Sequence, residues 1–484
     1  MPSRSPLRRL SVALRLAEAY QPPDAPAVAL TTTTSLSLFL INAKANFLKD
    51  VKEDEAKAAD WIVVMGNEAG DLDTIASSIA YAWIQSEIYK KPAVPLLHIH
   101  RNDFVLRAEN LHALKLAGLS PNQEELLTLD DLSQYQPFPA RKFALVDHNC
   151  LADAFTHNNP QAHVVAIIDH HHDEGHHLDA NPRVVTPCGS CASHIASLCP
   201  PEIPAELATL LLSAILIDTD GLVSGGKATS IDREAALILA PKTTFGNTIP
   251  PPSALSPIDH PNPDALSEVQ SIKDLTSILA EKKADVSHLG GLDLLRRDYK
   301  EYSHKLLWAT GQPTIKVGLS TVPTGLKSWA TDGRLEKAAV EWMKRRGLTI
   351  LGVLTSFRDA KKTLVGKNKK GKHKREMAWI ILETSDLAKT SSDGLTASSL
   401  ARRLWKGLEA NAEIEVRRHK KFDMEKSEGL PKNSQARVYK QGNASATRKA
   451  IAPLVKEILE GNNVKPAEEA KKQEEPTPTS TTKT

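Results

Sequence analysis

The stretch Val165-Ala166-Ile167-Ile168-Asp169-His170-His171-His172 decides the fold of this chain. Its short apolar run predicts a buried strand, and the run stops at an aspartate followed by three histidines. Open α/β sheets bind their ligands at the carboxyl ends of their strands. The stretch therefore predicts a parallel sheet with a site of imidazoles and carboxylates at its edge, provided that other strands supply partners.

Three further apolar segments end in polar residues of the same kind. Trp61–Met65 and Phe143–Val146 are short and predict two more buried strands, whereas Leu210–Ile217 is longer and predicts a buried helix. Together with the two histidines after the first strand, the candidate site residues are Asp71, Asp73, Asp147, His170, His171 and Asp218. Aspartate is common in turns, which would explain any one of these positions but not four elements that end alike.

The ends of these elements converge on one edge of a doubly wound sheet. Several carboxylates with one or two imidazoles are the ligands that paired hard divalent cations take. We therefore expect a site for two divalent cations, Mg²⁺ or Mn²⁺, with Co²⁺ as a further candidate.

A second, smaller α/β domain follows a Pro-rich linker that contains Pro250-Pro251-Pro252. In this domain Ile315–Ser320, Leu348–Ser356 and Met377–Leu382 predict strands, and Arg334–Arg346 predicts a helix. The expected fold class is thus α/β, with a doubly wound, mainly parallel sheet in the first domain and a second, smaller α/β domain.

The domain boundaries follow from shifts in composition. The prediction is a disordered or transit-like leader over 1–35, a first domain over 36–241, a linker over 242–265, a second domain over 266–460 with a basic insert at 361–375, and a disordered tail over 461–484. The start of the second domain, Asp285–Tyr302, predicts a helical region. The basic insert is either a solvated loop or a surface that steers polyanions.

Composition and charge exclude several classes of protein. The net charge of +3 over 484 residues gives no overall preference for polyanions, so no nucleic-acid partner is expected. No apolar run approaches the roughly 20 residues of a membrane span, so no membrane partner is expected either. Cys188 and Cys191 form a CxxC without a second pair at zinc-ribbon spacing, and we interpret all four cysteines as reduced thiols. A cytoplasmic monomer is expected, and the arginine-rich leader leaves mitochondrial import open.

The motifs in their order resemble those of the DHH phosphoesterase superfamily. The matching motifs are Asp71-x-Asp73, Asp147-His148-Asn149, Asp169-His170-His171 and Asp218. The second domain is similar to the DHHA2 type. There, Arg296–Glu301 resembles the family's lysine-bearing segment, and Thr447–Pro453 resembles its Ser-Arg-Lys-Gln phosphate-binding segment. The resemblance covers about residues 36 to 460.

The resemblance implies a role for each matched residue. Asp71 and Asp147 would hold one cation with Asn67 nearby, and the second cation would be held by Asp73, Asp147, His170 and Asp218. The catalytic set would be Asp147, His171 and Lys300. The phosphate-binding set would be His148, His171, Lys300, Arg448 and Lys449. His148 and Asp169 would also orient ligands, whereas we interpret the remaining histidines of this loop as surface residues: His172, His176 and His177.

Asn67 favours polyphosphate over pyrophosphate as the expected substrate. Pyrophosphatases of this family carry histidine at this place, whereas asparagine is similar to the fungal exopolyphosphatase form. Loss of that imidazole favours Mg²⁺ over transition metals. Thr74, where the family usually has serine, keeps a hydroxyl for capping the following helix. The resemblance thus implies an enzyme that releases terminal phosphate from inorganic polyphosphate. The alternatives are an inorganic pyrophosphatase and a non-catalytic, prune-like regulatory protein.

Overall fold

The computed structural model describes residues 34–251, 264–358, 371–383, 395–425 and 427–461. Four predicted segments therefore lie wholly or largely outside the described residues: the leader up to residue 33, linker residues 252–263, insert residues 361–370 and the tail from residue 462.

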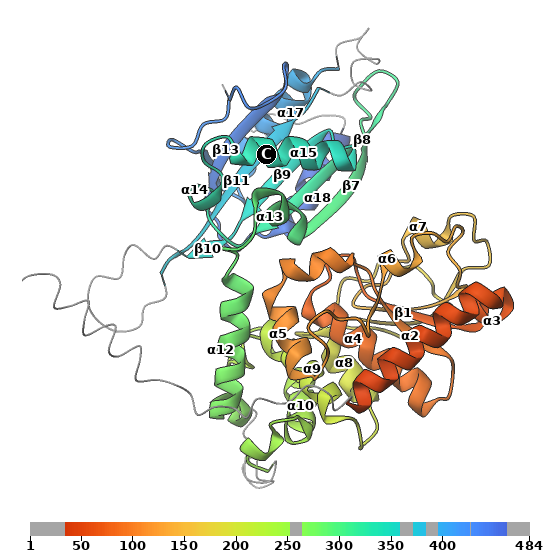
Figure 1. Cartoon of the computed structure of the whole chain (residues 1–484). Coiled ribbons are helices and arrows are strands. Elements are labelled where there is room, and N and C mark those ends of the chain that lie inside the picture. The colour runs from red at the N-terminus through yellow and green to blue at the C-terminus, as the bar shows by residue number, and fades with distance from the viewer. Residues whose placement is uncertain (1–33, 252–263, 359–370, 384–394, 426, 462–484) are drawn as a thin grey trace, which may run out of the picture.

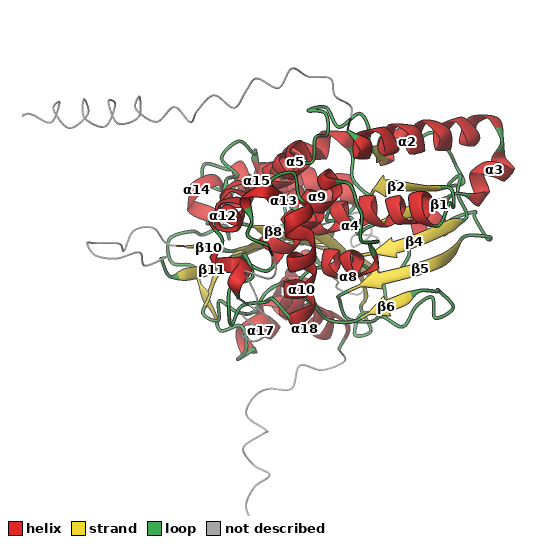
Figure 2. Cartoon of the chain, turned by 90° about the horizontal axis from the view of Figure 1, so that it is seen from below, coloured by secondary structure: helices red, strands yellow, loops and turns green. Residues whose placement is uncertain are grey.

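The first domain is built on a six-stranded parallel sheet with the order β3-β2-β1-β4-β5-β6. Its strands are β1 (Ile62–Met65), β2 (Ala93–Leu97), β3 (Leu127–Thr128), β4 (Lys142–Val146), β5 (His163–Asp169) and β6 (Arg183–Val185). The strand order reverses between β1 and β4, which pair directly, and β4, β5 and β6 lie side by side in Figure 2. This confirms the predicted doubly wound, mainly parallel sheet, and it places the switch point between β1 and β4.

Helices pack around this sheet. They include α2 (Ser35–Glu53), α3 (Glu55–Asp60), α4 (Leu72–Trp83), α5 (Ala108–Leu116), α6 (Leu129–Leu132), α7 (Asp153–Thr156), α8 (Cys191–Leu198), α9 (Ala205–Asp218) and α10 (Ser230–Leu239). Every residue of α4 is buried, because it packs on β1 and β2 and is covered in turn by α8 and α9. The predicted buried helix is α9, whose residues from Leu207 to Ile217 are all buried.

The second domain is a mixed sheet with helices on both faces. Its strands follow the order β12-β13-β11-β9-β8-β7, with β10 paired to β11. They are β7 (Tyr299–Lys305), β8 (Thr314–Val322), β9 (Ile350–Thr355), β10 (Phe357–Arg358), β11 (His373–Ile381), β12 (Val416–Arg418) and β13 (Gln435–Gln441). Its helices are α13 (Gly291–Arg297), α14 (Leu326–Trp329), α15 (Arg334–Arg346), α17 (Ala397–Ala410) and α18 (Arg448–Glu460), whereas α12 (Gln270–Ala284) precedes them and has its buried residues in the core of the first domain. Alternate residues of β11 enter two separate cores, Trp379 beside α17 and α18 and Ile380 beside α13 and α15.

The start of the second domain differs from the sequence prediction. The predicted helical region ends at Arg297, and Tyr299 begins β7, which pairs with β8 along its whole length. The residues at the end of the predicted insert also form regular structure, because His373 and Lys374 pair with β10 and Arg375 pairs with Gln441. Figure 1 shows α12 running beside the first domain and leading into the second. Among the described helices, none has the length and apolar surface that crossing a bilayer requires.

Candidate metal centre

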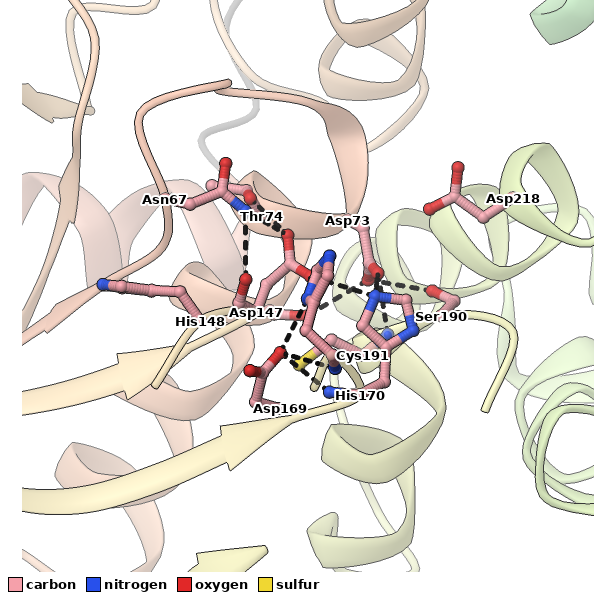
Figure 3. Close-up of polar contacts among 12 residues, drawn as sticks. Asn67, Asp73, Thr74, Asp147, His148, Asp169, His170, Ser190, Cys191 and Asp218 are labelled. Atoms are coloured by element: carbon pink, nitrogen blue, oxygen red, sulfur yellow. Dashed lines mark hydrogen bonds and ion pairs between the residues drawn. The ribbon is translucent and has the colours of Figure 1, made fainter. Parts of the chain in front are cut away.

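The candidate centre lies at the carboxyl ends of three adjacent strands. Asn67 follows β1, Asp147 follows β4, and His170 and His171 follow Asp169 at the end of β5. Figure 3 shows Asn67 and His170 converging on Asp147. Ligand atoms of Asp147, His170 and His171 all lie within 4.8 Å of one another. The three motifs that the sequence placed on separate strands therefore meet in space.

Asp147 is at the middle of this cluster and is 2% exposed. Its Oδ2 accepts hydrogen bonds from Asn67 Nδ2 at 2.8 Å and from Thr74 Oγ1 at 2.6 Å. Its Oδ1 is buried and accepts no hydrogen bond from any described residue. A buried carboxylate oxygen without a donor is costly unless a cation compensates it, so this atom fits a bound metal ion.

His170 presents a nitrogen lone pair to the same place. Its Nδ1 donates to the Cys188 carbonyl at 3.0 Å, so the proton of a neutral ring is on Nδ1 and Nε2 is free to bind a cation. Nε2 lies 3.2 Å from Asp147 Oδ1 and 3.8 Å from Asp73 Oδ2. Burial opposes protonation of His170, but Asp147, the Cys188 carbonyl and Asp73 outweigh it and raise the pKa to about 12. A positive charge is therefore strongly favoured between these groups, whether a proton or a metal ion supplies it.

Asp73 is held by the start of α8. Its Oδ1 accepts from Ser190 Oγ at 2.8 Å and from the Ala192 N–H at 2.8 Å, and its Oδ2 accepts from the Cys191 N–H at 2.7 Å. Burial, together with the charges of Asp147 and Asp218, raises the pKa of Asp73 well above its usual range. The CxxC motif thus contributes two backbone groups to this centre, the Cys191 N–H and the Cys188 carbonyl. None of the four cysteines forms a disulfide bond.

Asp169 fixes the orientation of His171. Its Oδ1 lies 2.8 Å from His171 Nδ1 and accepts from two backbone N–H groups, while its Oδ2 accepts from Asn149 Nδ2 at 2.6 Å. Although burial opposes it, the hydrogen bonds from His171 and Asn149 lower the pKa of Asp169 to about 2. Because His171 donates Nδ1–H to this carboxylate, its Nε2 remains the free nitrogen.

Asp71 and Asp218 approach the cluster without joining it. Asp71 caps α4 and accepts from the Thr74 N–H at 3.1 Å. Burial would raise the pKa of Asp71, but Arg107 and this hydrogen bond lower it. Asp218 ends α9, apart from Asp73 in Figure 3, with Lys283 Nζ 3.5 Å from its Oδ1. Burial raises the pKa of Asp218 to about 6.

One sequence expectation about the first motif is revised by these contacts. Asp71, not Thr74, supplies the side-chain cap of α4, so the Thr74 hydroxyl is available to donate to Asp147. Asn67 uses its oxygen to accept from the Ala69 N–H at 2.9 Å and its Nδ2 to donate to Asp147. In this conformation Asn67 supports Asp147 through its amide nitrogen.

Basic residues of the second domain face this edge of the sheet. Burial raises the pKa of Glu68, in the loop after β1, and the charges of Lys300, Arg346 and Arg448 oppose that rise. Burial lowers the pKa of His148, with Lys300 contributing to the decrease. The His148 ring points away from the Asp147 cluster in Figure 3.

The two basic residues of the phosphate-binding motif lie at the start of α18. Arg448 donates to the Asp298 carbonyl at 3.1 Å and pairs with its carboxylate at 2.8 Å, while Lys449 is exposed.

Two family models match the chain. The model described as "DHH family, N-terminal domain" matches residues 61–215, and the model described as "DHHA2 domain" matches residues 277–458. The chain therefore contains a DHH domain followed by a DHHA2 domain, as the motifs predicted.

Three curated proteins are similar to the chain over part of their length. It is 33% identical over 267 residues to "Putative exopolyphosphatase" of Schizosaccharomyces pombe, a match that covers 51% of this chain and 62% of that protein. It is 27% identical over 271 residues to "Exopolyphosphatase PRUNE1" of Bos taurus, covering 54% of this chain and 53% of that protein. It is also 28% identical over 165 residues to "Manganese-dependent inorganic pyrophosphatase" of Methanothrix thermoacetophila, covering 33% and 48%. The chain thus spans less than two thirds of each of these relatives.

Proposed function

We propose that the protein is a metal-dependent exopolyphosphatase that hydrolyses the terminal phosphate of inorganic polyphosphate. The observation that carries this proposal is the buried Asp147 Oδ1, which lacks a hydrogen-bond donor among the described residues and faces His170 Nε2. The names of the fungal and PRUNE1 relatives support the choice of substrate.

In this proposal Asp147 and His170 belong to a two-cation centre, in which Asp147 is shared by both cations. Asp71 and Asp147 would hold one cation, and the second would be held by Asp73, Asp147, His170 and Asp218. When bound, the cations supply Lewis acidity, which activates a water and neutralises phosphate charge. Asn67 and Thr74 hold Asp147 Oδ2 so that Oδ1 stays directed toward His170.

The remaining residues act on the phosphate chain. His171, oriented by Asp169, donates Nε2–H to a phosphoryl oxygen in its doubly protonated form. Lys300, Arg448 and Lys449 approach from the DHHA2 domain and neutralise charge on the transferred group. His148 completes the phosphate-binding set, and the charge of Lys300 contributes to the lowering of its pKa. Arg448 must exchange its pairing with Asp298 for one with phosphate, which its planar guanidinium binds through two hydrogen bonds.

Pyrophosphate is the competing substrate because one relative is named as a pyrophosphatase. Asn67 argues for the longer chain, since its amide supports Asp147 where that enzyme class, by resemblance, has an imidazole ligand. The test offers purified protein long-chain polyphosphate and pyrophosphate in parallel, with Mg²⁺ and with Mn²⁺, and measures released orthophosphate. Turnover of polyphosphate exceeding that of pyrophosphate is expected. Rapid pyrophosphate turnover with inert polyphosphate would establish the pyrophosphatase instead, and no turnover of either substrate would favour the non-catalytic, regulatory alternative.

A further inference from the structure

A second group of metal-binding side chains lies beside the candidate centre, in residues that the sequence patterns left unassigned. The Cys150 sulfur, a Glu174 carboxylate oxygen and a His176 ring nitrogen all lie within 4.8 Å of one another. Cys150 follows the second motif, and the other two residues belong to the loop between β5 and β6. Cys150 is half-buried, whereas Glu174 and His176 are exposed.

Hydrogen bonds on both sides of Cys150 hold these two segments together. The preceding residue, Asn149, accepts from the Glu174 N–H through Oδ1 at 2.9 Å. The following residue, Leu151, donates its N–H to His177 Nε2 at 3.2 Å. The segments that carry the three candidate ligands are therefore held together by two hydrogen bonds, each from a backbone N–H to a side chain, that do not use the candidate ligands' own side chains.

The loop is also anchored at its base. Arg183 of β6 donates to both carboxylate oxygens of Asp173, at 2.7 Å to Oδ2 and 2.5 Å to Oδ1, and Asp173 accepts from the Gly175 N–H at 2.8 Å. These contacts fix the residues on either side of Glu174 without using its side chain.

The surroundings of Cys150 are negatively charged. Burial and the charges of Glu174 and Asp153 raise the pKa of its thiol. A divalent cation would reverse this effect, because binding displaces the thiol proton and pairs the resulting thiolate with a positive charge. Thiolate, imidazole and carboxylate together suit Zn²⁺, whereas Mg²⁺ takes oxygen ligands.

We propose that Cys150, Glu174 and His176 form a separate site for a borderline divalent cation such as Zn²⁺, with water completing its coordination. A cation bound there would tie the loop after β5 to the turn after β4. The tie would act through Asn149, whose Nδ2 donates to Asp169 and to the His172 carbonyl at 2.6 and 3.0 Å. The bound cation would hold in place the loop that surrounds His171. This role goes beyond the proposed hydrolysis.

The test uses Co²⁺ as a spectroscopic probe of the full-length protein, with Mg²⁺ present in excess. A cobalt ion bound by a thiolate gives a sulfur-to-metal charge-transfer band in the near ultraviolet. The wild-type protein is expected to show this band at one equivalent of Co²⁺, Zn²⁺ should displace it, and Cys150→Ser should abolish it. Cys199→Ser is the matched control, because Cys199 is also a half-buried free thiol but lies at the end of α8.

Two changes in the exposed loop test the other ligands without disturbing the core. Glu174→Gln and His176→Gln should each weaken Co²⁺ binding by at least about tenfold. His172→Gln, an exposed histidine of the same loop, should leave it unchanged. The proposal is overturned if the wild type shows no band, if the band persists in Cys150→Ser, or if His172→Gln weakens binding as much as His176→Gln. None of these readouts depends on hydrolysis of polyphosphate.

Discussion

Arg297 of α13 donates through Nη2 to Oε1 of Glu109 of α5 at 3.0 Å, and their side chains are only 5% and 1% exposed. This buried ion pair joins the second domain to the first. Arg107 extends the contact, since it donates to the Arg297 carbonyl and to the Ala69 carbonyl of the loop after β1, both at 3.0 Å. The loop that leads to the candidate centre is thus linked directly to the segment that continues into β7 and Lys300.

Breaking this pair from one side should destabilise the protein strongly. In Arg297→Met the volume is nearly kept, but the buried Glu109 loses its closer partner, which typically costs about 3–5 kcal/mol. Arg296→Met is the matched control, because Arg296 pairs with Asp103 and Asp293 in a more exposed setting. Such a pair is worth about 0–1 kcal/mol. Denaturant unfolding of both variants measures the difference, and equal losses would contradict a special role for Arg297.

Removing the charge of Asp147 should abolish cation binding. Outer ligand-orienting residues already cost about 10- to 100-fold in metal affinity, so loss of a direct ligand in Asp147→Asn should cost at least as much. Hydrolysis should fall in parallel. Calorimetric titration with Mg²⁺ measures the affinity, and Asp179→Asn, an exposed aspartate, is the control. Unchanged Mg²⁺ affinity in Asp147→Asn would contradict the assignment of Asp147 as a ligand.

Arg448 should act on substrate and leave the cations in place. Arg448→Ala removes the guanidinium that pairs with Asp298 at 2.8 Å. A hydrogen bond to a charged group contributes about 1.5–3 kcal/mol, so KM for polyphosphate should rise about 10- to 100-fold with Mg²⁺ affinity unchanged. Lys456→Ala, an exposed cation further along α18, controls for a general effect of positive charge. A parallel loss of Mg²⁺ affinity would mean that Arg448 supports the centre and not the substrate.

The parts of the fold that were predictable from the sequence are those with strong apolar runs. β1, β4 and β5 are buried strands of a parallel sheet, so their side chains are apolar on both faces and the polar residues after them are conspicuous. The amphipathic helix α15 begins and ends where its pattern predicted, between Gly333 and Gly347, both with positive φ. β7 escaped prediction, because the sequence Tyr-Lys-Glu-Tyr-Ser-His-Lys of this edge strand has no such run.

The contacts that orient the candidate ligands could not be read from the sequence. Asp73 is bonded to residues about 118 positions away, and His170 to a backbone carbonyl, which any residue type supplies. Lys283, beside Asp218, lies in a connecting helix whose pattern gives no functional signal. Such partners are fixed by tertiary packing, so a motif identifies the ligand but not the group that orients it.

His98 should make the protein sensitive to acid. Its ring packs edge-on against Phe155 with centroids 5.2 Å apart, and burial, with smaller effects of His148 and His100, lowers its pKa to about 4. An unfolded histidine has a pKa of about 6.5, so between pH 6.5 and 4 the unfolded state binds a proton that the native state does not. The contribution of His98 to stability therefore falls as pH decreases through this window, by up to about 3 kcal/mol at pH 4.

The measurement is the free energy of unfolding at several pH values between 7 and 4, for wild type and His98→Gln. The variant lacks the titrating group, so its stability relative to wild type should increase steadily as the pH falls, whatever its value at pH 7. His163→Gln, at the exposed first position of β5, should follow the wild-type curve. His170 does not titrate in this window, because its pKa is raised to about 12 in the metal-free state. If wild type and His98→Gln lose stability in parallel, acid sensitivity arises from groups other than His98.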